Sequence, residues 1–310
     1  MSAAVVTFGE TMAMISADHP GVLSRGAAAT WSFGGADSNV AVGLARLGVP
    51  VTWVGRVGDD QPGRMIVAGL RGEGIDVVAI SDPNPTGLML KFRRTTDRVN
   101  IAFRRSGSAG SFLAPDDLLH HSSLGEAKIV HCTGITPALS KSSRNATFAA
   151  VREGRRNGAL ISFDVNYRPT LWSRQEALSC ISELAQEADL IFASPEEIDL
   201  ALPEGIESFI NGGPERTVII KDGARGAQGY TAKNRVHVHA VPITVQDAVG
   251  AGDAFVAGYL SAYLEGASLE RALQRAVVTG AFACLSPGDW EGAPYLEELT
   301  LLADPDPVSR

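Results

Sequence analysis

Short, nearly continuous apolar segments that alternate with amphipathic stretches constrain the fold of this 310-residue chain more than any other feature. Four of these segments occupy residues 127–134, 159–166, 188–194 and 216–223. Uninterrupted apolar runs of this length are typical of parallel strands that are buried on both faces. Residues 140–158 and 173–188 lie between them and have the pattern of helices. This order predicts an α/β fold, in which helices flank a central, mostly parallel sheet.

The N-terminal third adds further elements to this core. Residues 3–9 and 51–58 are predicted strands, and residues 37–48 form a predicted helix that Gly48 can cap. Residues 86–94 and 98–105 are strand-like segments separated by a polar turn, which favours a hairpin, while residues 11–33 are expected to be irregular. We therefore expect one domain over residues 1–310, with a small β appendage formed by about 11–34 and 86–106.

Composition excludes several classes of protein. The chain has 27 Lys and Arg against 35 Asp and Glu, a net charge of −8, which argues against a nucleic-acid partner. No apolar run reaches the ~18 residues of a membrane span, and the N-terminus does not resemble a signal peptide. The three cysteines form no CxxC pair, so neither a zinc site nor a disulfide framework is indicated. The expectation is a cytoplasmic enzyme without a membrane partner.

The segment DAVGAGDAF, residues 247–255, is the strongest candidate for chemistry. Gly250 and Gly252 allow a ligand to approach the backbone, and the helix that follows presents free N–H groups at its start. Such a turn binds anions, phosphate above all, and Asp253 could accept a proton from a hydroxyl that attacks phosphorus. The alternative is that Asp253 only caps the helix.

Four other segments place polar residues at the ends of strands or the starts of helices. Gly34 and Gly35 precede a predicted helix, and Arg168 follows the predicted strand at 159–166. Lys221 and Glu197 follow two further strands. Ligands bind at the carboxyl edge of open α/β sheets, so these residues are candidates for a binding site. The alternatives are a tight turn, a surface salt bridge, a solvated lysine and an acidic helix start.

Other phosphate-binding motifs are missing from the sequence. There is no GxxxxGK[ST] P-loop, no GxGxxG after the first strand, and no HRD and DFG pair. A nicotinamide-dependent dehydrogenase is therefore a distant possibility, and any phosphoryl transfer must use another arrangement.

Taken together, these motifs resemble those of the ribokinase-like, PfkB-type sugar kinases along nearly the whole chain. The segments GG with NVAVGLARLG, RVGDDQPG and DAVGAGDAFVAGY occur in the order of that family. Within the family, FDVNYRPTLW, GSAGS, TGITPALS and GDWEGAP are similar to 2-keto-3-deoxygluconate kinases. The resemblance implies that Gly250, Ala251 and Gly252 form an anion hole and that Asp253 is the catalytic base.

The resemblance also implies binding residues and partners. The sugar pocket would contain Gly34, Gly35, Phe103, Arg105, Arg168, Asp253 and Asp289. The ATP side would contain Ser194, Lys221, Gly223, Gly226, Val249, Gly250 and Gly252, with Glu197 near Mg²⁺. Family members also bind a monovalent cation such as K⁺ and form homo-oligomers through the appendage, which acts as a lid. Met89 and Phe103 stand where related kinases tend to have tyrosine, so the lid offers the substrate fewer hydrogen bonds.

The implied reaction is ATP-dependent phosphorylation of the primary hydroxyl of a ketodeoxy sugar acid. Two arginines, Arg105 and Arg168, suit a substrate that carries a carboxylate. The rival within the same class is a kinase for a neutral sugar, such as fructose or ribose, or for a nucleoside. A rival from another class is a non-catalytic sensor of a sugar acid or a nucleotide.

Overall fold

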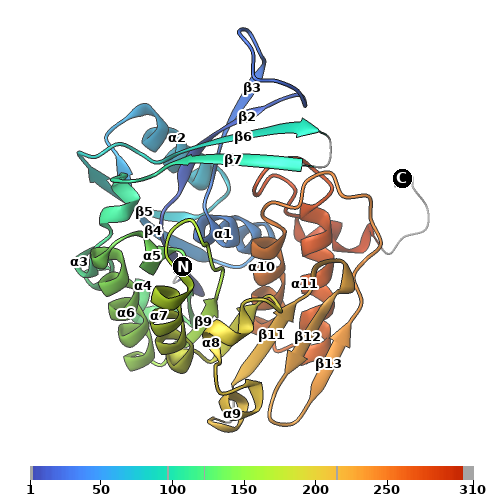
Figure 1. Ribbon diagram of the computed structural model, residues 1–310. Coiled ribbons are helices and arrows are strands. Elements are labelled where there is room, and N and C mark those ends of the chain that lie inside the picture. The colour runs from blue at the N-terminus through green and yellow to red at the C-terminus, as the bar shows by residue number, and fades with distance from the viewer. Residues whose placement is uncertain (1–2, 96–97, 122, 214–215, 303–310) are drawn as a thin grey trace.

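A large sheet between two layers of helices dominates the computed structural model, which describes residues 3–95, 98–121, 123–213 and 216–302 (Figure 1). In spatial order its strands are β13 (Arg235–Val238), β12 (Ala227–Tyr230), β11 (Thr217–Lys221), β10 (Leu190–Ala193), β9 (Leu160–Asp164), β8 (Ile129–Thr133), β1 (Val5–Phe8), β4 (Val51–Gly58) and β5 (Asp76–Asp82). The strands from β11 to β5 pair in parallel, and β12 and β13 extend the sheet with antiparallel pairs. The predicted α/β class is confirmed.

Helices cover both faces of this sheet because its central strands are apolar on both sides. All residues of β1, β8 and β10 are buried. One face carries α3 (Pro115–Leu119), α4 (Ser123–Glu126), α5 (Thr136–Leu139), α6 (Lys141–Arg156), α7 (Arg174–Glu187), α8 (Ile198–Ala201) and α9 (Ile206–Asn211). The other face carries α1 (Ala36–Arg46), α2 (Gln61–Gly72), α10 (Ala251–Leu264) and α11 (Leu269–Ala283). Each layer has its own apolar core.

The predicted helix boundaries agree with side-chain caps. Ser140 accepts a hydrogen bond from the N–H of Ser143 at the start of α6, and Ser173 forms a capping box with Glu176 at the start of α7. Gly48, just beyond α1, has the positive φ of a left-handed C-terminal cap. Local sequence therefore sets where these helices begin and end.

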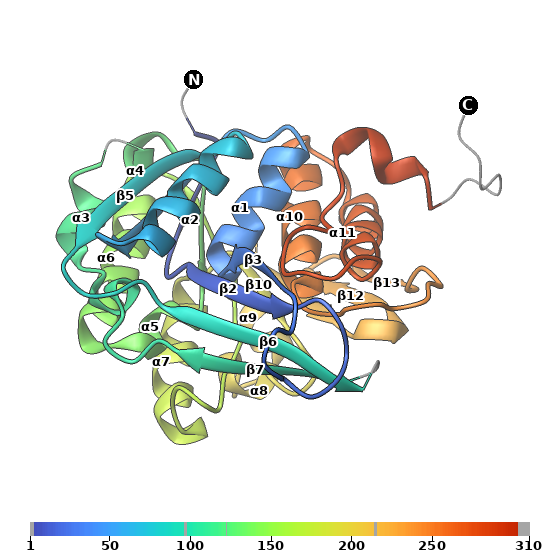
Figure 2. The ribbon, with the colours of Figure 1, turned by 90° about the horizontal axis from the view of Figure 1, so that it is seen from above.

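A second, four-stranded sheet lies across one end of the large sheet (Figure 2). Its order is β3 (Ala29–Gly34), β2 (Met12–Ala17), β6 (Leu88–Thr95) and β7 (Arg98–Arg104). The hairpin expected at 86–105 is present as β6 and β7. The expectation that residues 11–33 are irregular is wrong, because this stretch contains β2 and β3. Only the first half of β2 is buried and the first half of β3 is exposed, so these strands lack the continuous apolar pattern of the core strands.

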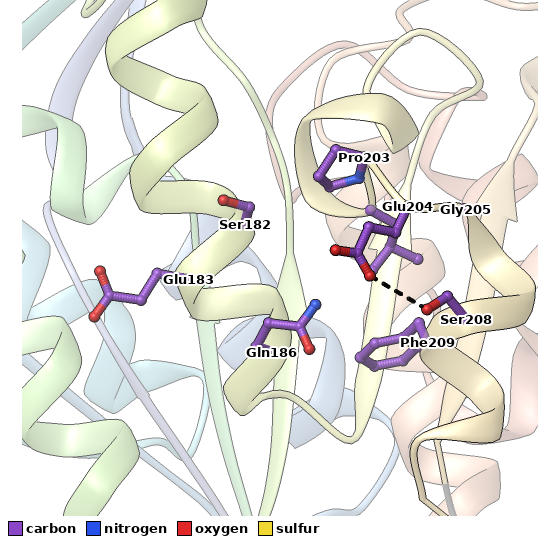
Figure 3. Close-up of a pocket in the computed structure, with 9 residues that line it drawn as sticks. Ser182, Glu183, Gln186, Pro203, Glu204, Gly205, Ser208 and Phe209 are labelled. Atoms are coloured by element: carbon purple, nitrogen blue, oxygen red, sulfur yellow. Dashed lines mark hydrogen bonds between the residues drawn. The ribbon is translucent and has the colours of Figure 1, made fainter.

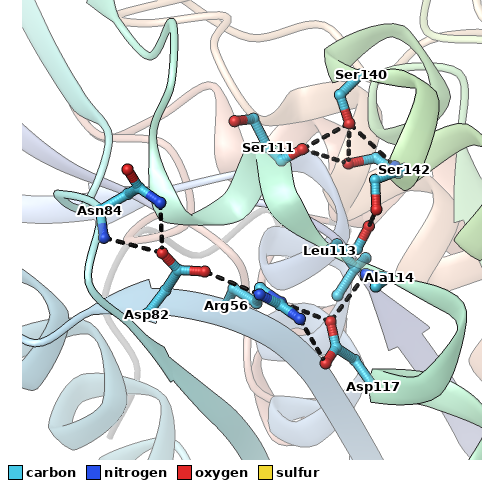
Figure 4. A network of polar contacts seen from close by, with 10 residues as sticks. Arg56, Asp82, Asn84, Ser111, Leu113, Ala114, Asp117, Ser140 and Ser142 are labelled. Carbon is cyan, nitrogen blue, oxygen red and sulfur yellow. Dashed lines mark hydrogen bonds and ion pairs between the residues drawn. The ribbon is translucent and has the colours of Figure 1, made fainter.

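Ion pairs fix the segment that leads into the small sheet (Figure 4). The guanidinium group of Arg56, on β4, donates to Asp82 Oδ2 at 2.9 Å and to both oxygens of Asp117 at 2.6 and 3.0 Å. Asp82 Oδ1 in turn accepts from the backbone and side-chain nitrogens of Asn84. Arg56 thereby joins the large sheet, α3 and the turn that precedes β6. None of the helices in the described part of the chain is long and apolar enough to span a membrane.

Candidate active site

A cleft of about 950 Å³ lies between the small sheet and the carboxyl edge of the large sheet. Its volume is in the range of small-molecule binding sites. Most of the residues proposed from the sequence line it, namely Gly35, Phe103, Arg105, Arg168, Ser194, Glu197, Lys221, Val249, Gly250, Gly252, Asp253 and Asp289. Residues that are far apart in the chain therefore meet in one cavity.

Four proposed residues do not line this cleft: Gly34, Ala251, Gly223 and Gly226. Ala251 is the first residue of α10, between two glycines that do line it. Gly34 lies behind Asp289, since a Cβ atom there would come within 2.4 Å of Asp289 Oδ2. Gly226 packs against β13, because a Cβ atom would lie 2.0 Å from the carbonyl oxygen of Val238.

Asp253 is buried in the first turn of α10, with 8% of its surface exposed. Its Oδ2 atom accepts a hydrogen bond of 2.8 Å from Nδ2 of Asn39, which lies in the first turn of α1. Burial raises the pKa of Asp253 to about 7, although the hydrogen bond from Asn39 opposes the shift. The carboxyl group therefore changes protonation state near neutral pH, which suits a general base.

The turn before Asp253 can adopt its shape only with glycine. Gly250 caps α10 with φ +77°, a left-handed conformation. A Cβ atom at Gly250 would lie 1.6 Å from the carbonyl oxygen of Asp289, which no side chain can tolerate. The 14-residue helix α10 directs its free N–H groups and partial positive charge toward the cleft. This arrangement can bind an anion.

Lys221 lies next to the turn but is not a solvated lysine. Its Nζ atom is 2.8 and 2.7 Å from the two oxygens of Asp164, and would lie 3.5 Å from a Cβ atom at Gly252. Burial raises the pKa of Asp164, while the charge of Lys221 lowers it. The two residues end β11 and β9, so the large sheet itself positions this ion pair.

The two arginines of the cleft differ in their partners. Arg105 donates to Oε2 of Glu10 from Nε at 2.8 Å and from Nη2 at 2.6 Å, and Glu10 also accepts from the hydroxyl of Ser108. Arg168 is exposed, and its guanidinium group has no hydrogen bond or ion pair within the described part of the chain. The charge of Arg105 is therefore compensated, and that of Arg168 is available to a ligand.

Glu197 has a fixed orientation at the other end of the cleft. Its Oε1 atom accepts from the N–H of Tyr167 at 2.7 Å and its Oε2 atom from that of Ser194 at 2.8 Å. Each oxygen keeps a further lone pair. Oxygen donors of this kind suit Mg²⁺, which binds few protein carboxylates and keeps several waters. Among the described residues, no cluster of three or more His, Cys, Asp or Glu side chains could hold a metal ion.

Several groups in or beside the cleft escaped the proposed set. Asn39 bonds to Asp253, Glu10 to Arg105, and Lys91 of β6 to Asp247 and Asp289. The sequence could have indicated that Lys91 is buried, because strand alternation puts it on the same face of the predicted strand as the apolar Met89. Nothing in the sequence pairs Asn39 with Asp253, since 214 positions separate them.

A second cavity, of about 380 Å³, lies between α7 and the segment around α9 (Figure 3). Ser182 and Gln186 of α7 lie across it from Glu204 and Ser208, and the hydroxyl of Ser208 donates to Glu204 at 3.4 Å. None of the residues proposed from the sequence lines this cavity. The large cleft is therefore the candidate active site.

Comparison with known proteins agrees with this geometry. Residues 2–295 match the model of the pfkB family carbohydrate kinases. The chain is 38% identical to 2-dehydro-3-deoxygluconokinase of Bacillus subtilis (strain 168), over 95% of this chain and 93% of that protein. It is 33% identical to the protein of the same name from Thermoproteus tenax, over 95% and 92%. A protein from E. coli assigned as ribokinase II, solved with ATP and Mg²⁺, is 26% identical with a TM-score of 0.88, over 97% and 99%.

Proposed function

The chain belongs to the pfkB family of carbohydrate kinases, and on that premise we propose that it phosphorylates the primary hydroxyl of a ketodeoxy sugar acid. The best-supported reaction converts 2-keto-3-deoxygluconate to 2-keto-3-deoxy-6-phosphogluconate, with ATP as the phosphoryl donor. The observation that carries this choice is the 38% identity to a 2-dehydro-3-deoxygluconokinase over nearly the full length of both chains.

Asp253 is the general base of the proposed reaction. Its carboxylate orients the sugar hydroxyl toward the γ-phosphorus and accepts the hydroxyl proton as the O–P bond forms. Asn39 holds that carboxylate in place through its 2.8 Å hydrogen bond. Gly250, Ala251 and Gly252 direct backbone N–H groups at the transferring phosphoryl oxygens, where negative charge must be stabilised.

Arg168 is the main partner of the substrate carboxylate. It is exposed to the cleft and unpaired within the described residues, whereas Arg105 is already bonded to Glu10. A guanidinium group can bind a carboxylate with two parallel hydrogen bonds. Gly34, Gly35, Phe103, Arg105 and Asp289 complete the sugar pocket.

The nucleotide occupies the other half of the cleft. PfkB kinases bind ATP, and a solved relative of similar fold is an ATP and Mg²⁺ complex. Ser194, Lys221, Val249 and the glycine turn line the proposed ATP side, with Gly223 and Gly226 behind it. Glu197 would hold Mg²⁺, directly or through water, and the metal would supply positive charge that offsets the phosphates.

Three further parts of the proposal concern the setting of the enzyme. The chain is a single domain, and the small sheet, formed by about residues 11–34 and 86–106, acts as a lid over the cleft. The same sheet forms a homo-oligomer contact. Cross-strand pairing puts Trp31, Ile15, Leu90 and Ala102 in one apolar row on its outer face, where Trp31 is 58% exposed. A cytoplasmic location and a bound K⁺ stay predictions. Two side-chain ammonium groups, those of Lys91 and Lys221, lie near the glycine turn.

A coupled assay of ADP release over a panel of acceptors tests the function directly. The panel contains 2-keto-3-deoxygluconate, its galactonate epimer, fructose, ribose and adenosine, each with saturating MgATP. We expect the sugar acids to give the highest kcat/KM. Turnover of fructose, ribose or adenosine above that of both sugar acids would contradict the proposal, and no ADP release with any acceptor would favour the sensor.

The same panel of acceptors with the variant Arg168→Gln tests whether this arginine causes the preference for a sugar acid over a neutral sugar. A charge-assisted hydrogen bond contributes about 1.5–3 kcal/mol, so kcat/KM for the sugar acid should fall roughly 10- to 100-fold. The residual activity on neutral sugars should stay unchanged. Equal losses on acids and neutral sugars would mean that Arg168 does not bind the carboxylate.

The pH dependence should report the protonation of Asp253. A base must be deprotonated, and burial raises the pKa of Asp253 to about 7. We therefore expect kcat/KM to fall about tenfold per pH unit below that pKa and to level off above it, with Mg²⁺ in excess. A profile that is flat through the neutral range would exclude Asp253 as the titrating base.

A further inference from the structure

Lys91 carries a buried ammonium group at the junction between the lid and the glycine turn. It lies on the cleft-facing side of β6, and 3% of its side chain is exposed. Three oxygens surround Nζ: Asp247 Oδ2 at 2.8 Å, the carbonyl oxygen of Gly288 at 2.8 Å and Asp289 Oδ1 at 3.0 Å. Removal of a charge from water is costly, so a lysine in such a place requires this oxygen shell.

The oxygens that bind Lys91 belong to segments on either side of the glycine turn. Asp247 lies three positions before Gly250, and its Oδ1 atom accepts from the N–H of Val249 at 3.2 Å. The carbonyl oxygen of Asp289 packs directly against Gly250. One cation therefore links both segments that define where the turn lies.

Two buried carboxylates meet two cationic side chains at this site. Asp247 and Asp289 are 0% and 7% exposed, and Arg93 Nη2 is a second cationic partner of Asp247 at 3.0 Å. Burial alone would raise the pKa of Asp247, but the hydrogen bond and charge of Lys91, together with the backbone N–H groups of Val249 and Gly288, hold it below its usual range. Without Lys91, Arg93 alone would offset two carboxylates, and a vacant pocket lined by oxygens would remain beside the turn.

We propose that Lys91 is a tethered monovalent cation that positions the anion-hole turn, so that catalysis by this chain needs no free K⁺. An ammonium group and K⁺ are similar in size, and both bind shells of carbonyl and carboxylate oxygens. Because Lys91 is part of β6, the cation arrives with the lid and not from solution. Lys91 is a positioning residue, since it acts on the turn and not on the reacting atoms.

The test is chemical rescue of Lys91→Met, which keeps the apolar stem of the side chain and removes the terminal ammonium group, so the position of Nζ becomes vacant. The full chain is assayed at constant ionic strength in choline chloride, KCl or NH₄Cl. Wild-type kcat should be the same in all three salts. The variant should lose at least about tenfold in kcat in choline chloride and recover in KCl or NH₄Cl. Lys233→Met, at an exposed lysine, is the matched control and should behave as wild type in every salt.

A melting curve without substrate tests the same inference independently of the acceptor. The inference about Lys91 rests on the proposed function only in the turnover assay, so the melting curve can test it even if the chain is inactive on every sugar. K⁺ should raise the Tm of Lys91→Met and leave that of wild type unchanged, because only the variant has a vacant cation site. If Lys91→Met does not fold, Lys91→Gln is used, whose amide is neutral.

Three results would overturn the proposal. K⁺ could activate the wild-type enzyme, Lys91→Met could be fully active in choline chloride, or the folded variant could be inactive in every salt with no K⁺-dependent Tm. The last result would mean that Lys91 only connects the lid to the core and does not stand in for a monovalent cation.

Discussion

Asp253→Asn should lower kcat by about 10²–10⁴-fold, the usual contribution of a general base, and leave ATP affinity nearly unchanged. Asparagine has almost the same shape and can still accept the hydrogen bond that Asn39 donates to Asp253 Oδ2. What it cannot do is accept the hydroxyl proton. Turnover by coupled ADP release and binding of a fluorescent ATP analogue separate the two effects.

Asp37→Asn is the matched control for this experiment. Asp37 is also buried near the start of a helix, but it does not line the cleft and accepts hydrogen bonds from Thr133 and Thr136. Burial raises its pKa to about 8, so at neutral pH it is largely protonated and asparagine resembles it. This variant should keep near-normal turnover. Near-normal turnover of Asp253→Asn itself would falsify the assignment of the base.

Stability distinguishes a catalytic loss from a folding defect. The pKa of Asp253 is raised in the folded protein, so the folded state binds a proton more tightly than the unfolded state does. The contribution of Asp253 to stability therefore declines as pH rises from about 4 toward about 7. Asparagine does not titrate, so Asp253→Asn should be at least as stable as wild type at pH values above that window.

The sequence predicts the core of this fold because its strands are buried on both faces. The segments that became β1, β4, β8, β9, β10 and β11 are nearly continuous apolar runs, and helices cover them. Strands β2 and β3 were missed for the opposite reason, since half of β2 is only partly buried and half of β3 is exposed in the small sheet. Their identity as strands depends on pairing with each other and with β6, which composition does not encode.

The sequence predicts the individual motifs of the site but not which side chains contact one another. A glycine turn before an aspartate indicates an anion site wherever it occurs, because backbone freedom and a helix start are local properties. The partners are not local: Asn39 is 214 positions from Asp253, and Asp164 is 57 from Lys221. The consequence is largest for Lys221, whose isolated interpretation as a solvated residue fails because Asp164 is buried beside it.

Gly250→Ala should remove most activity through geometry alone. The left-handed φ of +77° costs a non-glycine residue about 1–2 kcal/mol, and the new Cβ atom would lie 1.6 Å from the carbonyl oxygen of Asp289. The turn must move to relieve this clash, so its N–H groups no longer face the phosphoryl oxygens. Loss of anion-hole donors typically lowers kcat by about 10²–10³-fold.

Gly48→Ala separates the clash from the strain. Gly48 has nearly the same φ, +76°, but a Cβ atom there meets nothing within 4 Å. Both variants should lose stability in thermal unfolding, because both place alanine in the left-handed region. Only Gly250→Ala should lose turnover, since Gly48 follows the end of α1 and does not line the cleft. If Gly250→Ala folds and keeps wild-type kcat, the backbone of this turn does not stabilise the transferring phosphoryl group.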